Sequence, residues 1–313
     1  MDLKDDGVVE AMKQLKLTHL FNEKDVPQIF KTLINNRMNG IKNIFLKCYD
    51  SHCLLEFDDF HIRFEKNDDN WTVTYVRTKE TMEVADPEKS IIDHLWLVLK
   101  NPSIKPYFCK FSVCENPENR HSQKMNPEKL NTLLQSMIDS IDHQIHMESF
   151  YSSGFNEDTF LSMLKHVKSG TLEHISFNLS WKEEGKHEKM KEIVELDQWK
   201  QAKHIFSVGV TPLKIENLFH CLFMKLKCDS ITPEIVTSVC EHFFYSSGFK
   251  SCELISENEE MNMDAILNAL QSIGFHVRDT RARLPVFKYL YDIDKHPMQM
   301  VMFGGEKNIT IRK

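Results

Sequence analysis

The sequence predicts an α/β fold: a small N-terminal helical region and a β-hairpin, followed by a curved, mainly parallel sheet of alternating β-α units. Three observations predict it. Several segments carry apolar residues at helical spacing and begin with a capping residue, often followed by proline. Short apolar or alternating runs, typical of strands, separate these helices at intervals of roughly 30 residues. The chain has only 10 glycines, and neither a Gly-x-Gly-x-x-Gly nor a Walker A motif occurs.

Residues 7–50 are predicted to form three short helices. Asp25 is an acceptable N-cap for the second, in which Pro27 follows Val26 near the start. The helical stripes are Val8, Val9, Met12 and Leu15 in the first helix, Val26, Ile29, Phe30, Leu33 and Ile34 in the second, and Ile41, Ile44, Phe45 and Cys48 in the third.

Residues 51–85 are predicted to form a β-hairpin and a connection. Apolar and polar residues alternate in 55–64 and again in 71–76, and the polar turn 67–70 separates the two runs. Residues 78–86 are polar and mark a boundary. The predicted domains are therefore 7–50, 51–85 and 86–313.

From residue 86 onward, strands and helices alternate. Helices are predicted to begin at Asp86-Pro87, Asn126-Pro127, Asn156 and Thr232-Pro233, and Gly170 is expected at the C′ position of the third of these. Strands are predicted at 107–113, 143–150, 172–179, 204–210, 222–228 and 252–255, with a later helix over 266–273 and a terminal hairpin over 298–312. Similar unit lengths favour a solenoid resembling leucine-rich-repeat architecture over a doubly wound sheet.

Composition and charge narrow the function classes. The net charge is -7 and the basic residues are interspersed with acids, so neither nucleic acid nor a membrane surface is an expected partner. The N-terminus lacks an apolar signal core, and no window reaches the ~20 apolar residues of a membrane span. The 8 cysteines include no Cys-x-x-Cys pair. We therefore expect reduced, buried thiols in a cytoplasmic or nuclear protein.

No catalytic, cofactor-binding or metal-binding residue is predicted. His143 and His146 are three apart on an expected strand, where that spacing points side chains to opposite faces. A nucleophilic Cys/His pair distant in sequence stays an open alternative. Trp199 is expected to be a core anchor, in a helix that either packs on two sides or starts late. Trp181, in the charged loop 180–189, is interpreted as part of a solvated connection or as a contact for a partner.

One stretch resembles a known domain. A strand opening with Gly170-Thr171-Leu172-Glu173, a later Gln198-Trp199-Lys200-Gln201-Ala202-Lys203 and an apolar strand behind it resemble the FTH domain of the nematode F-box A family. Further matches occur at 156–173, 218–220, 226–236, 249–255 and 309–312, and together the resemblance covers about residues 90–313. In this resemblance Gln198, Trp199, Lys200 and Ala202 are family-signature residues with a structural role.

The resemblance implies a function. FTH domains act as protein-interaction platforms, and family members with an F-box are substrate adaptors of Skp1–cullin ubiquitin ligases, in the ubiquitin-like conjugation pathway. Residues 7–50 resemble a divergent F-box, and the residues expected to contact a Skp1-type adaptor are Val26, Pro27, Ile29, Phe30, Leu33 and Ile34. The alternatives are that this stripe is the chain's own core, leaving a stand-alone FTH scaffold without ligase recruitment, or that a cryptic Cys/His hydrolase is present.

Overall fold

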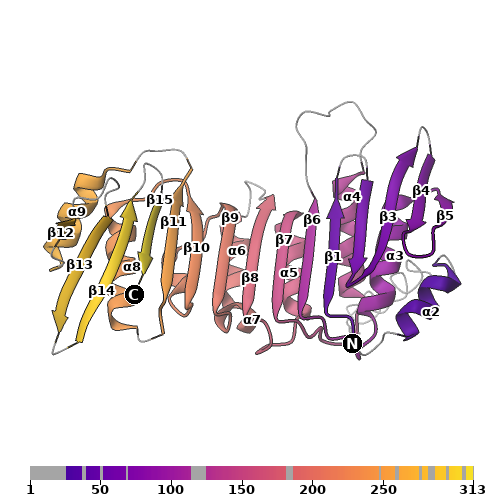
Figure 1. Cartoon of the computed structure of the whole chain (residues 1–313), viewed down its shortest axis with the longest axis horizontal. Coiled ribbons are helices and arrows are strands. Elements are labelled where there is room, and N and C mark those ends of the chain that lie inside the picture. Colours follow the sequence, from indigo (N-terminus) through magenta and orange to yellow (C-terminus); the bar gives the residue numbers. More distant parts are fainter. Residues whose placement is uncertain are drawn as a thin grey trace, which may run out of the picture. The chain divides into compact units, whose positions relative to one another are not determined.

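The structure is a computed structural model. It describes residues 26–36, 40–49, 52–67, 70–113, 125–180, 186–246, 248–257, 261–274, 277–280, 286–293, 296–304 and 308–312. The chain forms two compact units, and each is described by itself (Figure 1). The first is Met1–Leu172 with Leu179–Gly185 and Leu196–Gln198, and the second is Glu173–Asn178, Lys186–Glu195 and Trp199–Lys313. In the described residues, no helix is long and apolar enough to span a bilayer.

The first unit combines a parallel core with an antiparallel meander. Its helices are α2 (Gln28–Asn36), α3 (Pro87–Leu99), α4 (Pro127–Asp139) and α5 (Glu157–His166). Its strands are β1 (Asn43–Cys48), β2 (His52–Phe57), β3 (Phe60–Asn67), β4 (Asn70–Tyr75), β5 (Glu80–Val84), β6 (Phe108–Val113) and β7 (Ser149–Asn156). The order is β7-β6-β1-β2-β3-β4-β5. β1, β6 and β7 are parallel, and β1 to β5 are antiparallel neighbours.

Three predicted helix starts of this unit are confirmed, whereas Asp25, the predicted cap of the helix that is α2, lies outside the described residues. The side chains of Asp86, Asn126 and Asn156 accept hydrogen bonds from backbone N–H groups in the first turns of α3, α4 and α5. Proline is the first residue of α3 and of α4, where a missing N–H costs nothing. These three helices lie behind the strands in Figure 1, on one face of the sheet.

Buried polar side chains join each of these helices to the next. Glu88 of α3 accepts a hydrogen bond from the backbone N–H of Asn126, the cap of α4 (2.8 Å). Asn131 of α4 accepts one from the backbone N–H of Asn156, the cap of α5 (3.1 Å). The Asn131 side-chain amide also donates to the carbonyl of Pro127 at 2.9 Å. The desolvated groups are thereby paired, and each helix fixes where its successor begins.

Two predictions in the N-terminal part are wrong. The expected third helix is strand β1, in which Ile44, Leu46 and Cys48 are buried and the residues between them are half-buried. The apolar positions of this segment fit both the helical period and the two-residue period of a strand. Backbone pairing with β2 and β6 makes the segment a strand. The expected connection 78–86 contains edge strand β5, whose polar side chains suit a sheet edge. The first predicted helix lies outside the described residues, and the domain boundaries stay predictions.

The strand expected at 143–150 begins later in the structure. The strand is β7, Ser149–Asn156, so His143 and His146 precede it instead of lying on it. Asn156 ends the strand and caps α5 at once, leaving no loop between them. α5 ends at His166 with Val167 as its C-cap, and Gly170, at φ 82°, lies in the turn that follows. Gly170 is therefore a turn residue and not the C′ residue of the helix.

The second unit repeats strand and helix in chain order. Its elements, wholly or in part, are β8 (His174–Ser180), α6 (Lys186–Glu195), α7 (Asp197–Lys200), β9 (His204–Val210), η2 (Ile215–Leu218), β10 (Phe223–Cys228), α8 (Pro233–Tyr245), β11 (Ser251–Ser256), α9 (Met263–Ser272), β12 (Val277–Thr280), β13 (Val286–Ile293), β14 (His296–Gly304) and β15 (Asn308–Arg312). β8, β9, β10 and β11 are parallel and follow one another in the sheet.

The C-terminal strands close this sheet. β14 and β15 form the predicted terminal hairpin, and β15 pairs antiparallel with β11. β13 and β12 continue the antiparallel order beyond β14. Within each unit the parallel strands never reverse their order, as they would at the switch point of a doubly wound sheet. The α/β class, the mostly parallel sheet and the alternating strand–helix units are thus confirmed.

Candidate interaction surface

In the second unit, one face of the parallel sheet carries the helices and the other is open. Figure 1 shows α6 and α8 behind β8 to β11, with no helix of the described residues in front of these strands. Burial alternates along the strands, so every second side chain packs under the helices and the others point to the open face. We define the open face by the outward residues His174, Ser176, His204, Phe206, Val208, Phe223, Lys225, Ser251 and Glu253.

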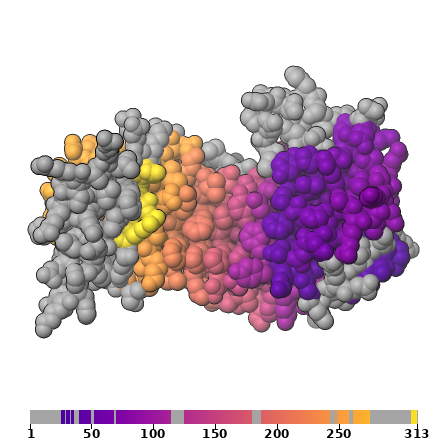
Figure 2. Space-filling view, viewed as in Figure 1, coloured from indigo at the N-terminus to yellow at the C-terminus, as the bar shows by residue number. Residues whose placement is uncertain are grey.

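A row of stacked rings crosses this open face. His174, His204 and Phe223 are register partners on three adjacent strands. The His174 and His204 rings lie 4.0 Å apart at 13°, and the His204 and Phe223 rings 4.7 Å apart at 9°. Beside this row, Val208 is 48% exposed, a high value for a valine in a strand. The open face therefore presents stacked, partly apolar side chains to the outside. Figure 2 shows the surface of this part of the chain, in pink to orange, from that side.

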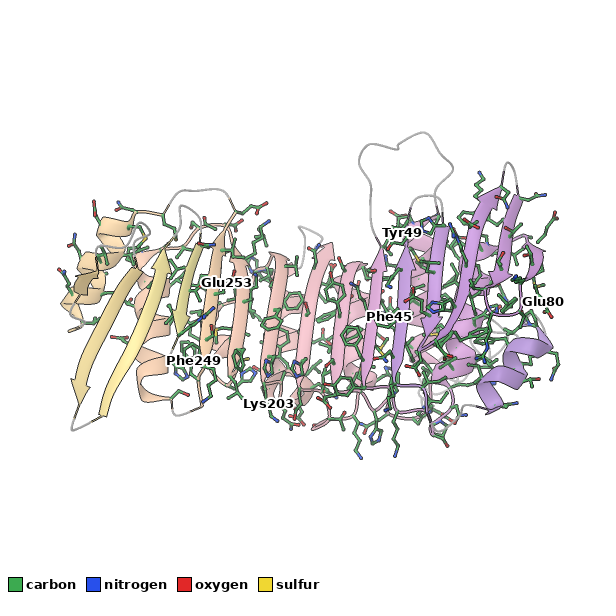
Figure 3. All side chains as sticks on the ribbon, viewed as in Figure 1. Phe45, Tyr49, Glu80, Lys203, Phe249 and Glu253 are labelled. Atoms are coloured by element: carbon green, nitrogen blue, oxygen red, sulfur yellow. The ribbon has the colours of Figure 1, made fainter. Side chains whose placement is uncertain are left out.

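Charges on and beside the open face are paired. Lys225 and Glu253, on β10 and β11, form an ion pair at 2.9 Å, and Lys203 pairs with Glu173 at the strand starts (Figure 3). The hydrogen bond from Lys203 lowers the pKa of Glu173. Partial burial, and after it the neighbouring imidazole of His174, lowers the pKa of His204, so the neutral form of this central ring is favoured. Such a surface suits apolar contact better than attraction of a strongly charged ligand.

In the first unit, the side of β1, β6 and β7 that faces away from α3, α4 and α5 also carries aromatic side chains. The Phe45 and Phe108 rings lie 5.5 Å apart, with the Lys47 ammonium 4.8 Å from the Phe45 ring centre. The Lys110 ammonium lies 4.5 Å from the ring centre of Tyr151. Phe45 is labelled in Figure 3. These lysines cover aromatic surface, so less apolar area is open to a partner here.

The residues predicted to contact a Skp1-type adaptor lie on α2 and just before it. Val26, Phe30 and Ile34 are 2%, 0% and 4% exposed. The Phe30 ring packs against Phe57, Phe60 and His94, with ring centres 5.6, 5.7 and 4.9 Å away. Pro27 is half-buried, and the side chains of Ile29 and Leu33 lie outside the described set. The exposed side of α2 carries the polar residues Gln28, Thr32 and Asn35.

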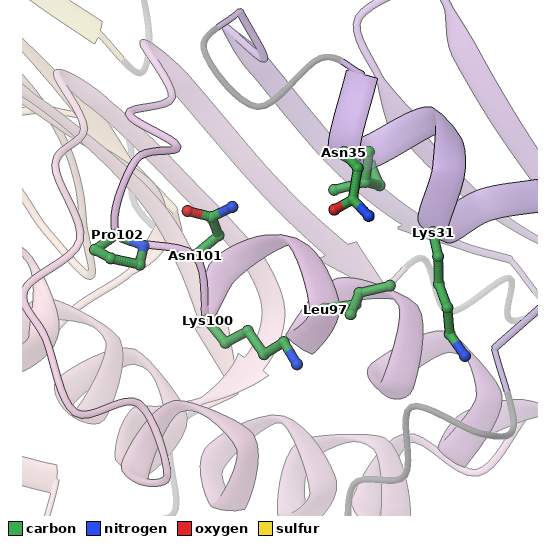
Figure 4. A pocket seen from close by; sticks show the side chains of 7 residues that line it. Lys31, Asn35, Leu97, Lys100, Asn101 and Pro102 are labelled. Carbon is green, nitrogen blue, oxygen red and sulfur yellow. The ribbon is translucent and has the colours of Figure 1, made fainter. Parts of the chain in front are cut away.

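A cavity of about 350 Å³ lies between α2 and the end of α3 (Figure 4). Ile34, Leu97 and Pro102 supply apolar walls, and the polar lining is Lys31, Asn35, Lys100 and Asn101. The Lys100 ammonium lies 4.1 Å from the Trp96 ring centre, and burial lowers the pKa of Lys100. Sequence reasoning missed this cavity because its walls come from two helices distant in the chain.

The signature residues lie in and around α7. Leu196 separates α6 from α7, so Trp199 belongs to a second, short helix, and the late start is the correct one of the two expectations. Trp199 is fully buried, donates its indole N–H to the carbonyl of Asn217 (3.2 Å) and packs against Phe177. The Gln198 amide donates to the carbonyl of Val167 (2.7 Å). Ala202 is buried, whereas Lys200 is exposed. Trp181 lies outside the described residues.

His220 and Cys221 form a close Cys/His contact, with His220 Nε2 and Cys221 Sγ 3.5 Å apart. However, Nε2 lies 2.9 Å from the carbonyl oxygen of Trp199, which can only accept, so Nε2 carries its proton. Burial raises the pKa of Cys221 to about 12. A thiol of high pKa beside an N–H donor has no base to activate it, so this contact does not form a nucleophilic pair.

Comparison with known families gives one match. Residues 128–273 match the FTH domain. This range contains β8 to β11 and the open face defined above. No curated protein sequence matches the chain.

Proposed function

We propose that this chain is a non-enzymatic protein-interaction platform that captures another protein on the open face of β8 to β11. The observation that carries the proposal is this face itself, which lies inside the FTH match and over which no helix of the described residues lies. Stacked rings and partly exposed apolar side chains in its centre, with ion pairs around them, resemble the apolar core and polar rim of protein interfaces.

The open face has side chains that are already ordered in the free protein, which lowers the entropic cost of binding a partner. Side chains on adjacent strands are held in register, and the His204 ring is fixed between two others. Groups already ordered in the free protein lose little conformational entropy when a partner arrives. The open face is therefore preorganised, and a single substitution in it is expected to affect binding more than stability.

Val208→Asp tests the binding face. Val208 is 48% exposed on β9, so the aspartate stays hydrated in the free protein but would be desolvated under a partner. We expect the variant to weaken capture at least tenfold, about 1.4 kcal/mol, with the fold unchanged by circular dichroism. The measurement is quantitative mass spectrometry of proteins retained from cell extract by the immobilised chain.

Val76→Asp is the matched control, because Val76 is 49% exposed but lies in the turn between β4 and β5. Proteins that bind the open face should be retained by wild type and by Val76→Asp, and lost with Val208→Asp. Equal retention by all three folded chains would contradict the proposed face.

Recruitment of a ubiquitin ligase is a separate part of the proposal. The FTH match supports a Skp1-type adaptor as second partner, since the resembling F-box family uses one. Burial of Val26, Phe30 and Ile34 supports the alternative, a stand-alone scaffold, because these side chains reach a partner only if α2 leaves its position. We favour the scaffold on this observation.

Co-purification with a Skp1-type adaptor distinguishes a ligase-recruiting chain from a stand-alone scaffold. Because Val26, Phe30 and Ile34 are buried, we expect no retention of the adaptor by folded wild-type chain. Retention by wild type that is reduced by Pro27→Ala, at a half-buried position, would instead establish the ligase adaptor. Thr32→Ala, at an exposed position, controls for a general effect of altering α2.

A further inference from the structure

Two cysteines face each other across the β1–β2 hairpin. Cys48 ends β1, Cys53 lies near the start of β2, and the two are register partners. Their Sγ atoms are 2.7 Å apart. Cys48 is 1% exposed and Cys53 0%, so both thiols are enclosed by the core of the first unit.

The hairpin places this pair where a disulfide fits. The backbone N–H of Tyr49 donates to the carbonyl of His52 at 2.8 Å, which makes Tyr49 and His52 a hydrogen-bonded pair. Such pairs alternate with non-hydrogen-bonded pairs, so Cys48 and Cys53 form one of the latter. In non-hydrogen-bonded pairs of antiparallel strands in general, the two Cα atoms are about 4.5 Å apart, within the roughly 4.4–6.8 Å that a disulfide spans. The rings of the neighbouring pair, Tyr49 and His52, stack on each other with their centres 4.6 Å apart.

We propose that Cys48 and Cys53 are a site of oxidative modification and form a cross-strand disulfide with a small disulfide oxidant such as glutathione disulfide. The thiolate of one cysteine attacks glutathione disulfide, forms a mixed disulfide and releases one glutathione. The other thiolate attacks the protein sulfur of that mixed disulfide and releases the second glutathione. The two cysteines lose two electrons and two protons, and one glutathione disulfide becomes two glutathione molecules.

Access sets the rate of this reaction. Burial raises the pKa of Cys53, with the hydrogen bond to Cys48 as a further cause, so Cys53 is a protonated thiol in the closed hairpin. The reaction is therefore expected to be slow with folded protein and faster during refolding, when the hairpin is still open. Its equilibrium position, in contrast, depends on how well the folded hairpin holds the two sulfur atoms together.

The test measures that equilibrium. The full chain is refolded in glutathione buffers of graded ratio, quenched in acid, unfolded, alkylated and cut with trypsin, which releases residues 48–63 as one peptide with both cysteines. We expect this peptide unalkylated and lighter by two hydrogen atoms in the oxidised fraction. The equilibrium constant should be about tenfold or more larger for the folded chain than for the chain in guanidinium, because the fold holds the thiols adjacent.

Two alanine variants sharpen the result. Cys48→Ala should leave Cys53 alkylated or carrying one glutathione. Cys109→Ala removes another buried thiol, on the neighbouring strand β6, and should leave oxidation of the 48–63 peptide unchanged. An equilibrium constant for folded wild type equal to or below that of the unfolded chain would overturn the proposal, and so would equal oxidation of the peptide in Cys48→Ala.

Discussion

Replacing Trp199 with alanine is expected to lower the free energy of unfolding of the second unit by about 4 kcal/mol, in the range for deleting a buried aromatic ring. The side chain is 0% exposed and its ring lies against Phe177. Its indole N–H donates a hydrogen bond to the backbone carbonyl of Asn217, with 3.2 Å between nitrogen and oxygen. The alanine variant leaves a cavity and a carbonyl without its donor. Urea unfolding followed by circular dichroism measures the change.

Two further variants define the cause. Trp199→Phe keeps most of the ring but loses the N–H donor, and we expect it to cost less than Trp199→Ala. Lys200→Ala changes the next residue, which is exposed, and should alter stability by no more than about 0.5 kcal/mol. A loss below about 1.5 kcal/mol for Trp199→Ala would show that the indole does not anchor this region.

Acid is expected to destabilise the first unit through His94. Burial lowers the pKa of this imidazole from 6.5 to about 4. Nδ1 donates to the carbonyl of Ser90 at 2.6 Å, and Tyr75 donates its hydroxyl to Nε2 at 2.6 Å, an arrangement that needs the neutral ring. The folded pKa lies below the unfolded one, so the unfolded chain binds more protons between pH 6.5 and 4. The stabilisation is complete above pH 6.5 and is lost as the pH falls towards 4.

The expected loss from His94 between pH 7 and pH 4.5 is about 2.5 kcal/mol. Because carboxylates titrate in the same range, the measurement is the difference in unfolding free energy between wild type and His94→Gln at each pH. That difference should shrink by about 2.5 kcal/mol in acid, since the glutamine has no proton to bind. His61→Gln, at a half-buried position on β3, is the control and should leave the acid sensitivity in place. An unchanged difference between the two pH values would contradict the prediction.

Local signals in the sequence predicted the helices well. Asp86, Asn126 and Thr232 combine a capping side chain with a following proline, and both groups act within a few residues of the helix start. The alternating run at Ser251–Ser256 likewise shows its buried face directly in the sequence. Such features need no knowledge of distant parts of the chain.

Features that depend on distant neighbours were not predictable. The segment Asn43–Cys48 is a strand because it pairs with β6, whose residues come more than 60 positions later. The open face was unknown because the sequence does not say on which side of the sheet the helices lie. The contact between Cys48 and Cys53 required the hairpin register, which shifts every side chain to the other face if it slips by one residue.

The hydrogen bonds that the backbone N–H of Asn126 donates to Glu88, and that of Asn156 to Asn131, bear on how the first unit unfolds. A stack of repeats loses its members one at a time only when the interface between neighbours is weak compared with each repeat. Here the start of α4 is completed by a side chain from α3, and the start of α5 by one from α4. Melting one helix strips a buried partner from the next, so we expect α3, α4 and α5 to unfold as a single cooperative segment, with amide hydrogens that exchange with one common opening free energy.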